Sequence, residues 1–217
     1  MYPMQTLSQK IDLLIEEYSL LKHPFYQSWS AGTLTKDMLA GYSKEYYQLV
    51  KAVPALVGKA ADGCAEEYTD EVAGVHLEEQ EHIGFWEKFA HSLNIDTSSL
   101  MNYTGLDKTQ AAVNMMLDAC VDQSSATAVM YAFEKEIPVV SQSKLDGLAK
   151  FYNMTSADAT DYFVLHTEAD IRHAAVWRNM LDAMPVEKHE ELLAAAKQSL
   201  IGQNTLLDVC YESYCMM

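Results

Sequence analysis

Residues that break helices are scarce in this sequence, and long apolar runs are absent from it. Only 9 of the 217 residues are glycine and 5 are proline. Such a composition favours α-helices, because glycine and proline concentrate in turns. No apolar run approaches the roughly 18 residues of a membrane-spanning helix, so we expect no membrane partner. The opening segment MYPMQTLSQK lacks the basic and apolar regions of a secretory signal, and we therefore expect a cytoplasmic protein.

Positive charge is also scarce. The chain has 15 lysine and arginine residues against 31 acidic residues, which gives a formal net charge of −16. A surface of this sign repels the phosphates of nucleic acids and of anionic membranes. We therefore exclude nucleic acid as an expected partner.

The motifs of several common enzyme classes are missing. The sequence has no GxSxG, P-loop or GxGxxG, so serine hydrolase, phosphate-loop and dinucleotide functions have no support. The four cysteines form no CxxC pair, which fits a reduced protein. Cys210 and Cys215 fall in a tail, about residues 209–217, that we expect to be flexible and exposed. Cys120 is the only cysteine that we expect to face a pocket.

Helical periodicity dominates the rest of the chain. Apolar residues recur every three or four positions, which predicts amphipathic helices. Thr35 fits an N-cap, and Pro54 should kink the helix that contains it. Because we see no repeat, linker or sustained strand alternation, we expect one all-α domain over residues 1–217, a bundle of about seven helices. The predicted helices span residues 6–21, 36–62, 64–92, 108–119, 122–150, 156–183 and 186–210.

The stretch HTEADIRH, residues 166–173, puts metal-ligand residue types on a helical stripe that should be packed in the core. A helix advances about 100° per residue, so His166, Asp170 and His173 fall on one face. The same face continues to Trp177. Two imidazoles and a carboxylate on a core-facing stripe predict a metal site.

The predicted helix over residues 64–92 has a similar stripe. In LEEQEH, Glu78 and Glu79 precede His82 by four and three positions. Both spacings bring a carboxylate and an imidazole to one face, so the spacing alone does not decide between the two glutamates. The stripe through His82 also carries Trp86, which indicates that it faces the core.

A third helix supplies another acid. In MYAFEKEIP, Glu134 lies between apolar residues and is followed four positions later by Pro138. Proline cannot donate a hydrogen bond to the carbonyl group of Glu134, so we expect a distorted helix beside this carboxylate.

Together the three helices would bring carboxylates and imidazoles into one core. Buried unpaired carboxylates carry a heavy desolvation cost, which two divalent cations would offset. Such ligands, projecting inward from facing helices, form di-iron and di-manganese sites in bundles, and both ligand types suit Fe(II) and Mn(II). A single histidine on an apolar face is usually a hydrogen-bonded core residue, and an EExxH pattern alone occurs by chance in acidic helices. The presence of ligand residue types on three buried-looking helical faces nevertheless favours the metal interpretation.

The motifs also resemble a known family. HPFYQSW and GYSKEYYQLVK, then EEQEHIGFWEKF, MYAFEKEIP and HTEADIRHA, are similar to the chlamydial protein associating with death domains and its bacterial relatives, within the haem-oxygenase-like helical superfamily. The resemblance runs over about residues 7–208. It implies a seven-helix bundle holding a dinuclear iron or iron–manganese centre. It also implies the synthesis of para-aminobenzoate for folate, with O₂ and an external reductant, from a tyrosine of the protein itself in a single turnover.

The resemblance implies roles for individual residues. Tyr26 would supply the ring of the product, Tyr42 would relay an electron or a proton, and Lys144 would be the amino donor. We consider a homodimer as the one candidate assembly, and we do not transfer the death-domain interaction to this acidic chain. The implied metal ligands are Glu78, His82, Glu134, His166, Asp170 and His173.

The chain departs from the family pattern at two places. The segment between the glutamate pair and His82 is shorter than in the family, which leaves the choice between the two glutamates open. Phe133 stands where the family has a tyrosine. If that tyrosine relays oxidising equivalents, this chain must use Tyr42 or Tyr131 instead, or work differently.

Three other functions remain as alternatives. The same ligands would serve a dinuclear iron oxygenase that acts on an external small molecule. A metal-free, thiaminase-like hydrolase would use Cys120 as its nucleophile. A protein that only binds partners through its acidic surface would have no reason to bury the HTEADIRH ligands.

Overall fold

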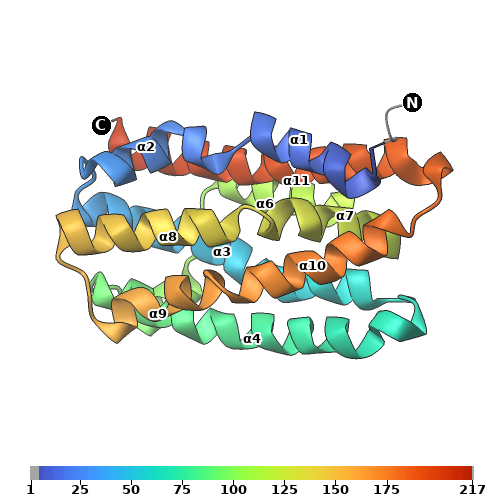
Figure 1. Cartoon of the computed structure of the whole chain (residues 1–217). Helices are drawn as coiled ribbons and strands as arrows, with labels where there is room; N and C mark the ends of the chain where they lie inside the picture. The colour runs from blue at the N-terminus through green and yellow to red at the C-terminus, as the bar shows by residue number, and fades with distance from the viewer. Residues whose placement is uncertain (1–4, 217) are drawn as a thin grey trace.

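Helices make up almost the whole chain and run lengthwise beside one another (Figure 1). The computed structural model describes residues 5–216, and no strand occurs among them. The α-helices are α1 Leu7–Glu17, α2 Pro24–Ala31, α3 Lys36–Ala61, α4 Thr69–Ser92, α5 Thr97–Asn102, α6 Asp107–Ala119, α7 Gln123–Glu134, α8 Ile137–Gly147, α9 Ala157–His166, α10 Ala169–Asp182 and α11 His189–Cys210.

Polar side chains cap several helices, and the cap predicted at Thr35 is confirmed. The hydroxyl of Thr35 accepts a hydrogen bond from the backbone N–H of Met38, at 3.3 Å, at the start of α3. Asp122 caps α7 in the same way through Ser125. Each cap satisfies a backbone donor that the helix leaves free. α3 continues through Pro54 to its end.

Two long predicted helices are divided. The segment 122–150 contains α7 and α8, because Pro138 lies at the start of a new helix and α7 ends on Glu134. This break confirms the distortion expected beside that carboxylate. The prediction of one helix over 156–183 is wrong, since α9 ends at His166 and α10 begins at Ala169.

Two short helices were not predicted. α2 begins at Pro24, where the ring of His23 accepts a hydrogen bond from the N–H of Phe25. α5 begins after Asp96, whose carboxylate accepts from the N–H of Ser99. Both lie between the predicted helices, because each is too short to show a clear period.

The end of the chain packs on the bundle. α11 continues to Cys210, which is fully buried, and residues 211–215 form a π-helical turn. The hydroxyl of Tyr214 donates to the buried carboxylate of Glu45 at 2.9 Å. The prediction of an exposed tail is wrong for the Cys210 thiol. Met217 lies outside the described residues.

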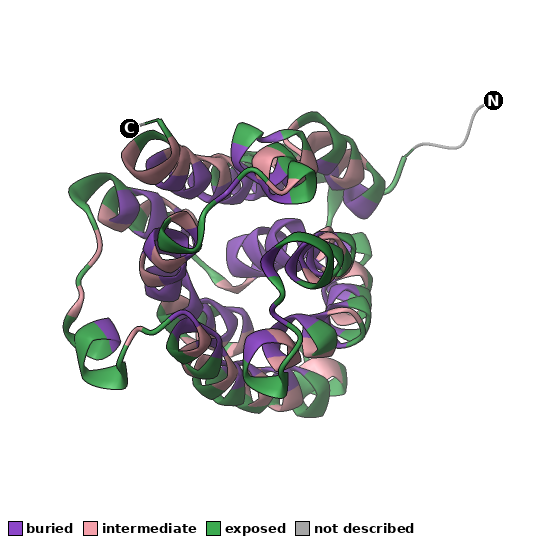
Figure 2. Cartoon of the chain, turned by 90° about the vertical axis from the view of Figure 1, so that its left-hand side faces the viewer, coloured by how far each residue is buried: buried purple, intermediate pink, exposed green. Residues whose placement is uncertain are grey.

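α3 lies at the centre of the packing. It contacts α4, α6, α7 and α11. In Figure 2 the buried faces of the surrounding helices point inward and the exposed faces point outward, as amphipathic helices require. In residues 5–216 no helix is long and apolar enough to cross a membrane.

Candidate metal centre

Six acidic and imidazole side chains meet inside the bundle. They come from four helices, α4, α7, α9 and α10. In Figure 1 the helices α9 and α10 lie above α4. Each is at most 4 % exposed, which is rare for charged residues unless they are paired or bind a metal. They are Glu79 and His82 on α4, Glu134 at the end of α7, His166 at the end of α9, and Asp170 and His173 on α10.

Glu79 lies between two sets of ligand atoms. One set joins Glu79 with His82 and His166, and the other joins it with Glu134 and His173. Within each set all ligand atoms lie within 4.8 Å of one another. Glu79 therefore belongs to both groups of residues that could hold a metal ion.

His173 brings the remaining acids together. Its Nδ1 atom lies 3.5 Å from an oxygen of Glu79, 3.5 Å from an oxygen of Asp170 and 3.7 Å from an oxygen of Glu134. On the other side of Glu79, the same carboxylate oxygen is 3.1 Å from Nδ1 of His82. The six residues thus form one continuous cluster.

Several buried polar atoms of the cluster have no hydrogen-bond partner. They are Nδ1 of His82 and of His173, Oε1 of Glu134, and both carboxylate oxygens of Asp170. Each such atom costs free energy when it is buried without a partner. Divalent cations would satisfy all of them, since carboxylate oxygens and imidazole nitrogens are their usual ligands. The residues therefore fit a pair of metal ions.

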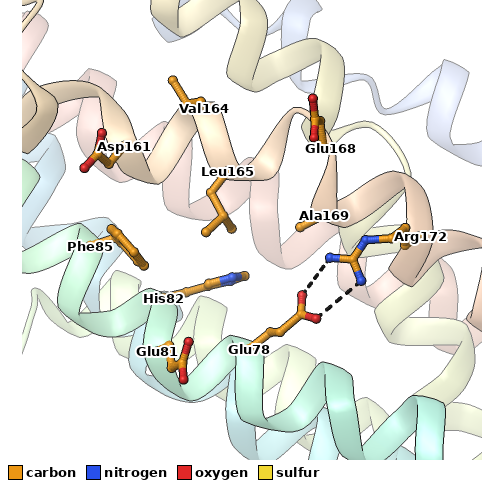
Figure 3. Close-up of a pocket in the computed structure, with 10 residues that line it drawn as sticks. All are labelled: Glu78, Glu81, His82, Phe85, Asp161, Val164, Leu165, Glu168, Ala169 and Arg172. Atoms are coloured by element: carbon orange, nitrogen blue, oxygen red, sulfur yellow. Dashed lines mark hydrogen bonds and ion pairs between the residues drawn. The ribbon is translucent and has the colours of Figure 1, made fainter.

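Glu78, the glutamate named first among the implied ligands, lies outside this cluster. Its side chain is 37 % exposed and pairs with the guanidinium group of Arg172 at 3.0 Å. Figure 3 shows the two side chains facing each other across the space between α4 and α10. Glu79 takes the buried position because α10 supplies a cation for Glu78, a contact that helical spacing within α4 does not reveal.

Glu78 nevertheless touches the cluster. Nε2 of His173 lies 3.0 Å from its carboxylate. With its proton on Nε2, the ring would present Nδ1, which is directed at the acids, to a cation. A carboxylate behind a histidine ligand fixes the tautomer and the orientation of the ring. Glu78 is therefore placed to position His173.

Hydrogen bonds also fix two other members. Nδ1 of His166 donates to the backbone carbonyl of Tyr162 at 2.5 Å, which leaves Nε2 free. Nε1 of Trp177 donates to Glu134 at 2.6 Å. Preorganised ligands of this kind are typical of metal sites.

The electrostatics of the cluster without a cation show how strongly it needs charge compensation. Burial raises the pKa of Glu134 well above its ordinary value, which favours the protonated form of this carboxyl group. Burial acts in the same direction on Glu79, but the nearby imidazoles of His173 and His82 outweigh it and lower the pKa to about 2. Binding of divalent cations would replace the proton and release it.

A second buried group lies on α2, α3 and α8. Nζ of Lys144 donates to the hydroxyl of Tyr42 at 2.9 Å, and that hydroxyl lies 3.4 Å from the hydroxyl of Tyr26. The same Nζ lies between 5.1 and 5.4 Å from the ring centroids of Tyr26, Tyr42, Tyr46 and Phe163. We call the group of Tyr26, Tyr42, Tyr46 and Lys144 the tyrosine pocket.

Burial sets the protonation of the tyrosine pocket. It lowers the pKa of Lys144 to about 7, because a buried ammonium group loses its hydration. It raises the pKa of Tyr26 and of Tyr42 well above the ordinary value. Near neutral pH the pocket therefore holds neutral phenols and a large fraction of neutral amine.

Other candidates lie elsewhere. The hydroxyl of Tyr131 donates to Asp12 on α1, and burial raises the pKa of the Cys120 thiol to about 11. A thiol that stays protonated is a poor nucleophile. Trp86, which the sequence places on a core stripe, and Tyr162 lie between the cluster and the tyrosine pocket.

Residues 41–202 match a protein family that is described as iron-containing redox enzyme and is named after haem oxygenase. Curated relatives extend the match to nearly the whole chain. A protein of Nitrosomonas europaea is 31% identical over 97% of this chain and 93% of its own length, and one of Chlamydia trachomatis is 28% identical over 94% and 96%. Both are named 4-aminobenzoate synthase. These matches confirm the family resemblance seen in the motifs.

Solved structures share the fold at low identity. A TenA homologue from Pseudomonas syringae has a TM-score of 0.80 at 13% identity and covers 98% of both chains. A CADD-like protein from Nostoc punctiforme has a TM-score of 0.70 at 15% identity and covers 96% of both chains. Haem oxygenase-1 from Synechocystis has a TM-score of 0.67 at 9% identity and covers 97% of this chain and 94% of its own. The chain belongs to the family of iron-containing redox enzymes with a haem-oxygenase-like fold.

Proposed function

We propose that this protein is an oxygen-dependent para-aminobenzoate synthase that consumes its own Tyr26 as the ring of the product and Lys144 as the amino donor. The observation that carries the proposal is the contact chain from Lys144 through Tyr42 to Tyr26, in a core that also holds the acid–imidazole cluster. The names of the curated relatives support the same product. The expected cytoplasmic location and a homodimer stay predictions.

The proposed ligands of two metal ions are the members of the buried cluster, with Glu79 in the place first given to Glu78. Two irons, or one iron and one manganese, would supply redox chemistry with O₂ there, using electrons from an external reductant. The ligand set is Glu79, His82, Glu134, His166, Asp170 and His173.

The residues of the tyrosine pocket prepare the reacting groups. Burial excludes water from Tyr26, which is 2 % exposed. The hydroxyl of Tyr42 lies between the Tyr26 hydroxyl and the Lys144 amine, so it can pass a proton from one to the other. The lowered pKa of Lys144 leaves the amine neutral in part of the molecules, and only the neutral form has the lone pair that an amino donor needs.

A dinuclear oxygenase acting on an external small molecule is the second candidate. The cluster would serve both reactions. The contact between Lys144 and Tyr42, and the full burial of that lysine, favour the first, because a buried lysine costs free energy that an external reaction does not require. The thiaminase-like alternative has no support, because the raised pKa of Cys120 keeps its thiol protonated and therefore a poor nucleophile.

Metal-loaded protein should release para-aminobenzoate once. We expect protein loaded anaerobically with Fe(II), or with Fe(II) and Mn(II), to release at most one molecule per chain after O₂ and a reductant are added. The reason is that each chain has one Tyr26 to lose. Chromatography with mass spectrometry measures the yield. Metal-free protein is the control, and a yield that keeps rising with fresh O₂ beyond one per chain would instead support an external substrate.

Removing the carboxylate behind His173 should weaken metal binding. In Glu78→Gln the amide no longer favours the Nε2–H tautomer of His173 as strongly, and the pair with Arg172 is lost. We expect the metal affinity to fall about 10- to 100-fold, the usual effect of such a partner. Competitive titration with a chelating dye measures it.

Glu81 gives the matched control. It is an exposed glutamate on the same helix, so Glu81→Gln removes the same charge from α4 without touching His173. We expect its metal affinity to equal that of the unmodified protein. Equal affinities for both variants would show that Glu78 does not position the ligand.

A further inference from the structure

A continuous line of aromatic rings joins the metal cluster to the tyrosine pocket. The ring of His166 lies 4.1 Å from that of Tyr162, centroid to centroid. Tyr162 lies 4.7 Å from Trp86, and Trp86 lies 5.7 Å from Tyr42. The hydroxyl of Tyr42 then lies 3.4 Å from that of Tyr26. Each ring is thus in contact with the next.

This line is sealed from water. Trp86 and Tyr42 are fully buried and Tyr162 is 7 % exposed. Nε1 of Trp86 donates to the backbone carbonyl of Ser43 at 2.8 Å, which fixes the orientation of the indole ring. In this orientation the indole makes T-shaped contacts with the rings of Tyr162 and Tyr42. An oxidised side chain in such a place has no solvent to react with.

A branch of the line strengthens its pocket end. Tyr46 stacks on Trp86 at 4.9 Å and contacts Tyr42 at 5.3 Å. Trp86 therefore touches two of the three pocket tyrosines and also the ring next to His166. Tyr131, the other tyrosine considered as a relay, instead donates its hydroxyl to Asp12 on α1. The position of Trp86 between the two sites makes it the natural intermediate.

We propose that Trp86 is a redox relay, which carries one electron at a time from the tyrosine pocket to the metal centre across the ring of Tyr162. The inference rests on the proposed function, since it explains how an oxidising equivalent generated from O₂ reaches Tyr26. It assigns a role to a residue that neither binds the metals nor enters the product.

The transfers balance in electrons and protons. Trp86 gives one electron, through Tyr162 and His166, to the metals that O₂ has oxidised. It keeps its N–H proton, which stays hydrogen-bonded to the Ser43 carbonyl. Tyr42 then gives one electron to the oxidised Trp86 and its hydroxyl proton to the lone pair of the neutral Lys144 amine, whose nitrogen lies 2.9 Å from the hydroxyl oxygen. Tyr26 then gives a hydrogen atom to the oxygen of Tyr42. The net result is one electron from Tyr26 on the metals and one proton on Lys144, and this proton has to leave before the amine can act as the amino donor.

A Trp86→Phe variant separates metal oxidation from tyrosine oxidation. After anaerobic loading with Fe(II) and addition of O₂, we expect the metals to oxidise at the rate of the unmodified protein, followed by optical absorbance. Loss of Tyr26, followed by mass spectrometry of the tryptic peptide 23–36, should slow about tenfold or more, a barrier increase of about 1.4 kcal/mol. Freeze-quenched samples should also show less tyrosyl radical by electron paramagnetic resonance.

Phe89→Leu is the matched control for packing. Phe89 is fully buried one helical turn from Trp86 and contacts it at 5.2 Å, so its truncation disturbs the same region without removing an oxidisable group. We expect loss of Tyr26 at the unmodified rate. Tyr162→Leu breaks the ring contact with His166 and should slow the reaction as Trp86→Phe does, which provides a second test if Trp86→Phe is unstable.

The outcomes separate the relay from the proposed function. Equal rates of Tyr26 loss in the unmodified protein and in Trp86→Phe, with both metals bound, would overturn the relay and leave the proposed function standing. An intact Tyr26 in the unmodified protein after its metals have been oxidised would overturn the proposed function and the relay with it.

Discussion

A Tyr26→Phe variant should release no para-aminobenzoate while keeping its fold and its metals. A phenyl ring lacks the O–H bond through which the pocket can withdraw an electron and a proton. The substitution removes only one hydroxyl group, whose partner Tyr42 lies at a long 3.4 Å, so the free energy of unfolding should fall by no more than about 1 kcal/mol. Product is measured by mass spectrometry after O₂ and reductant, and metal content by elemental analysis of the same sample.

Tyr47→Phe is the control for this loss. Tyr47 is a buried tyrosine on α3 whose hydroxyl donates to Glu87 at 2.7 Å, away from the tyrosine pocket. Its variant should release as much product as the unmodified protein. A full yield from Tyr26→Phe would exclude this residue as the ring source and would return the external substrate to first place.

A His173→Ala variant should lose the metal centre. His173 is fully buried, and its Nδ1 atom lies within 3.7 Å of Glu79, Glu134 and Asp170. Without this imidazole the acids face one another with fewer neutral ligands to hold a cation between them. We expect the unmodified protein to retain close to two metals per chain, and the variant to retain less than one, by elemental analysis after Fe(II) loading and desalting.

Stability gives a second signature of the same change. Removal of one partner from a buried charged group typically costs about 3–5 kcal/mol, so His173→Ala should also unfold at lower denaturant concentration. His91→Ala is the control, because His91 is an exposed histidine near the end of α4 and should change neither quantity. Two retained metals in His173→Ala would contradict the ligand role given to this residue.

The buried stripes were predictable from the sequence because they depend only on helical geometry. His166, Asp170 and His173 are all buried in the structure, as the 100° rotation per residue predicts. The prediction survived a break in the helix after His166, since the chain resumes its helical path at Ala169 within one turn. Glu134 was predictable for the same reason, together with the distortion that Pro138 causes.

The choice between the two neighbouring glutamates was not predictable from spacing. Glu78 and Glu79 both share a face with His82, and what distinguishes them is Arg172, 94 positions beyond Glu78 in the chain. The same limit applies to the tyrosine pocket. Lys144 and Tyr42 are 102 positions apart, so only the resemblance to the family could single them out in advance.

The packed end of the chain illustrates a similar limit. The segment around Cys210 and Tyr214 has few apolar residues in a regular period, yet it packs because the Tyr214 hydroxyl binds the buried carboxylate of Glu45. That carboxylate also accepts from the hydroxyl of Thr109. Contacts between distant polar residues of this kind leave no local pattern in the sequence.

The most direct measurement uses protein grown with ring-¹³C-labelled tyrosine. The purified protein is loaded anaerobically with Fe(II), or with Fe(II) and Mn(II), and then given O₂, reductant and no other aromatic compound. If the protein consumes Tyr26, the released para-aminobenzoate carries the label, and the peptide 23–36 loses the mass of the tyrosine ring in equal amount. Unlabelled product, or labelled peptide that stays intact while the metals turn over O₂, would contradict the account.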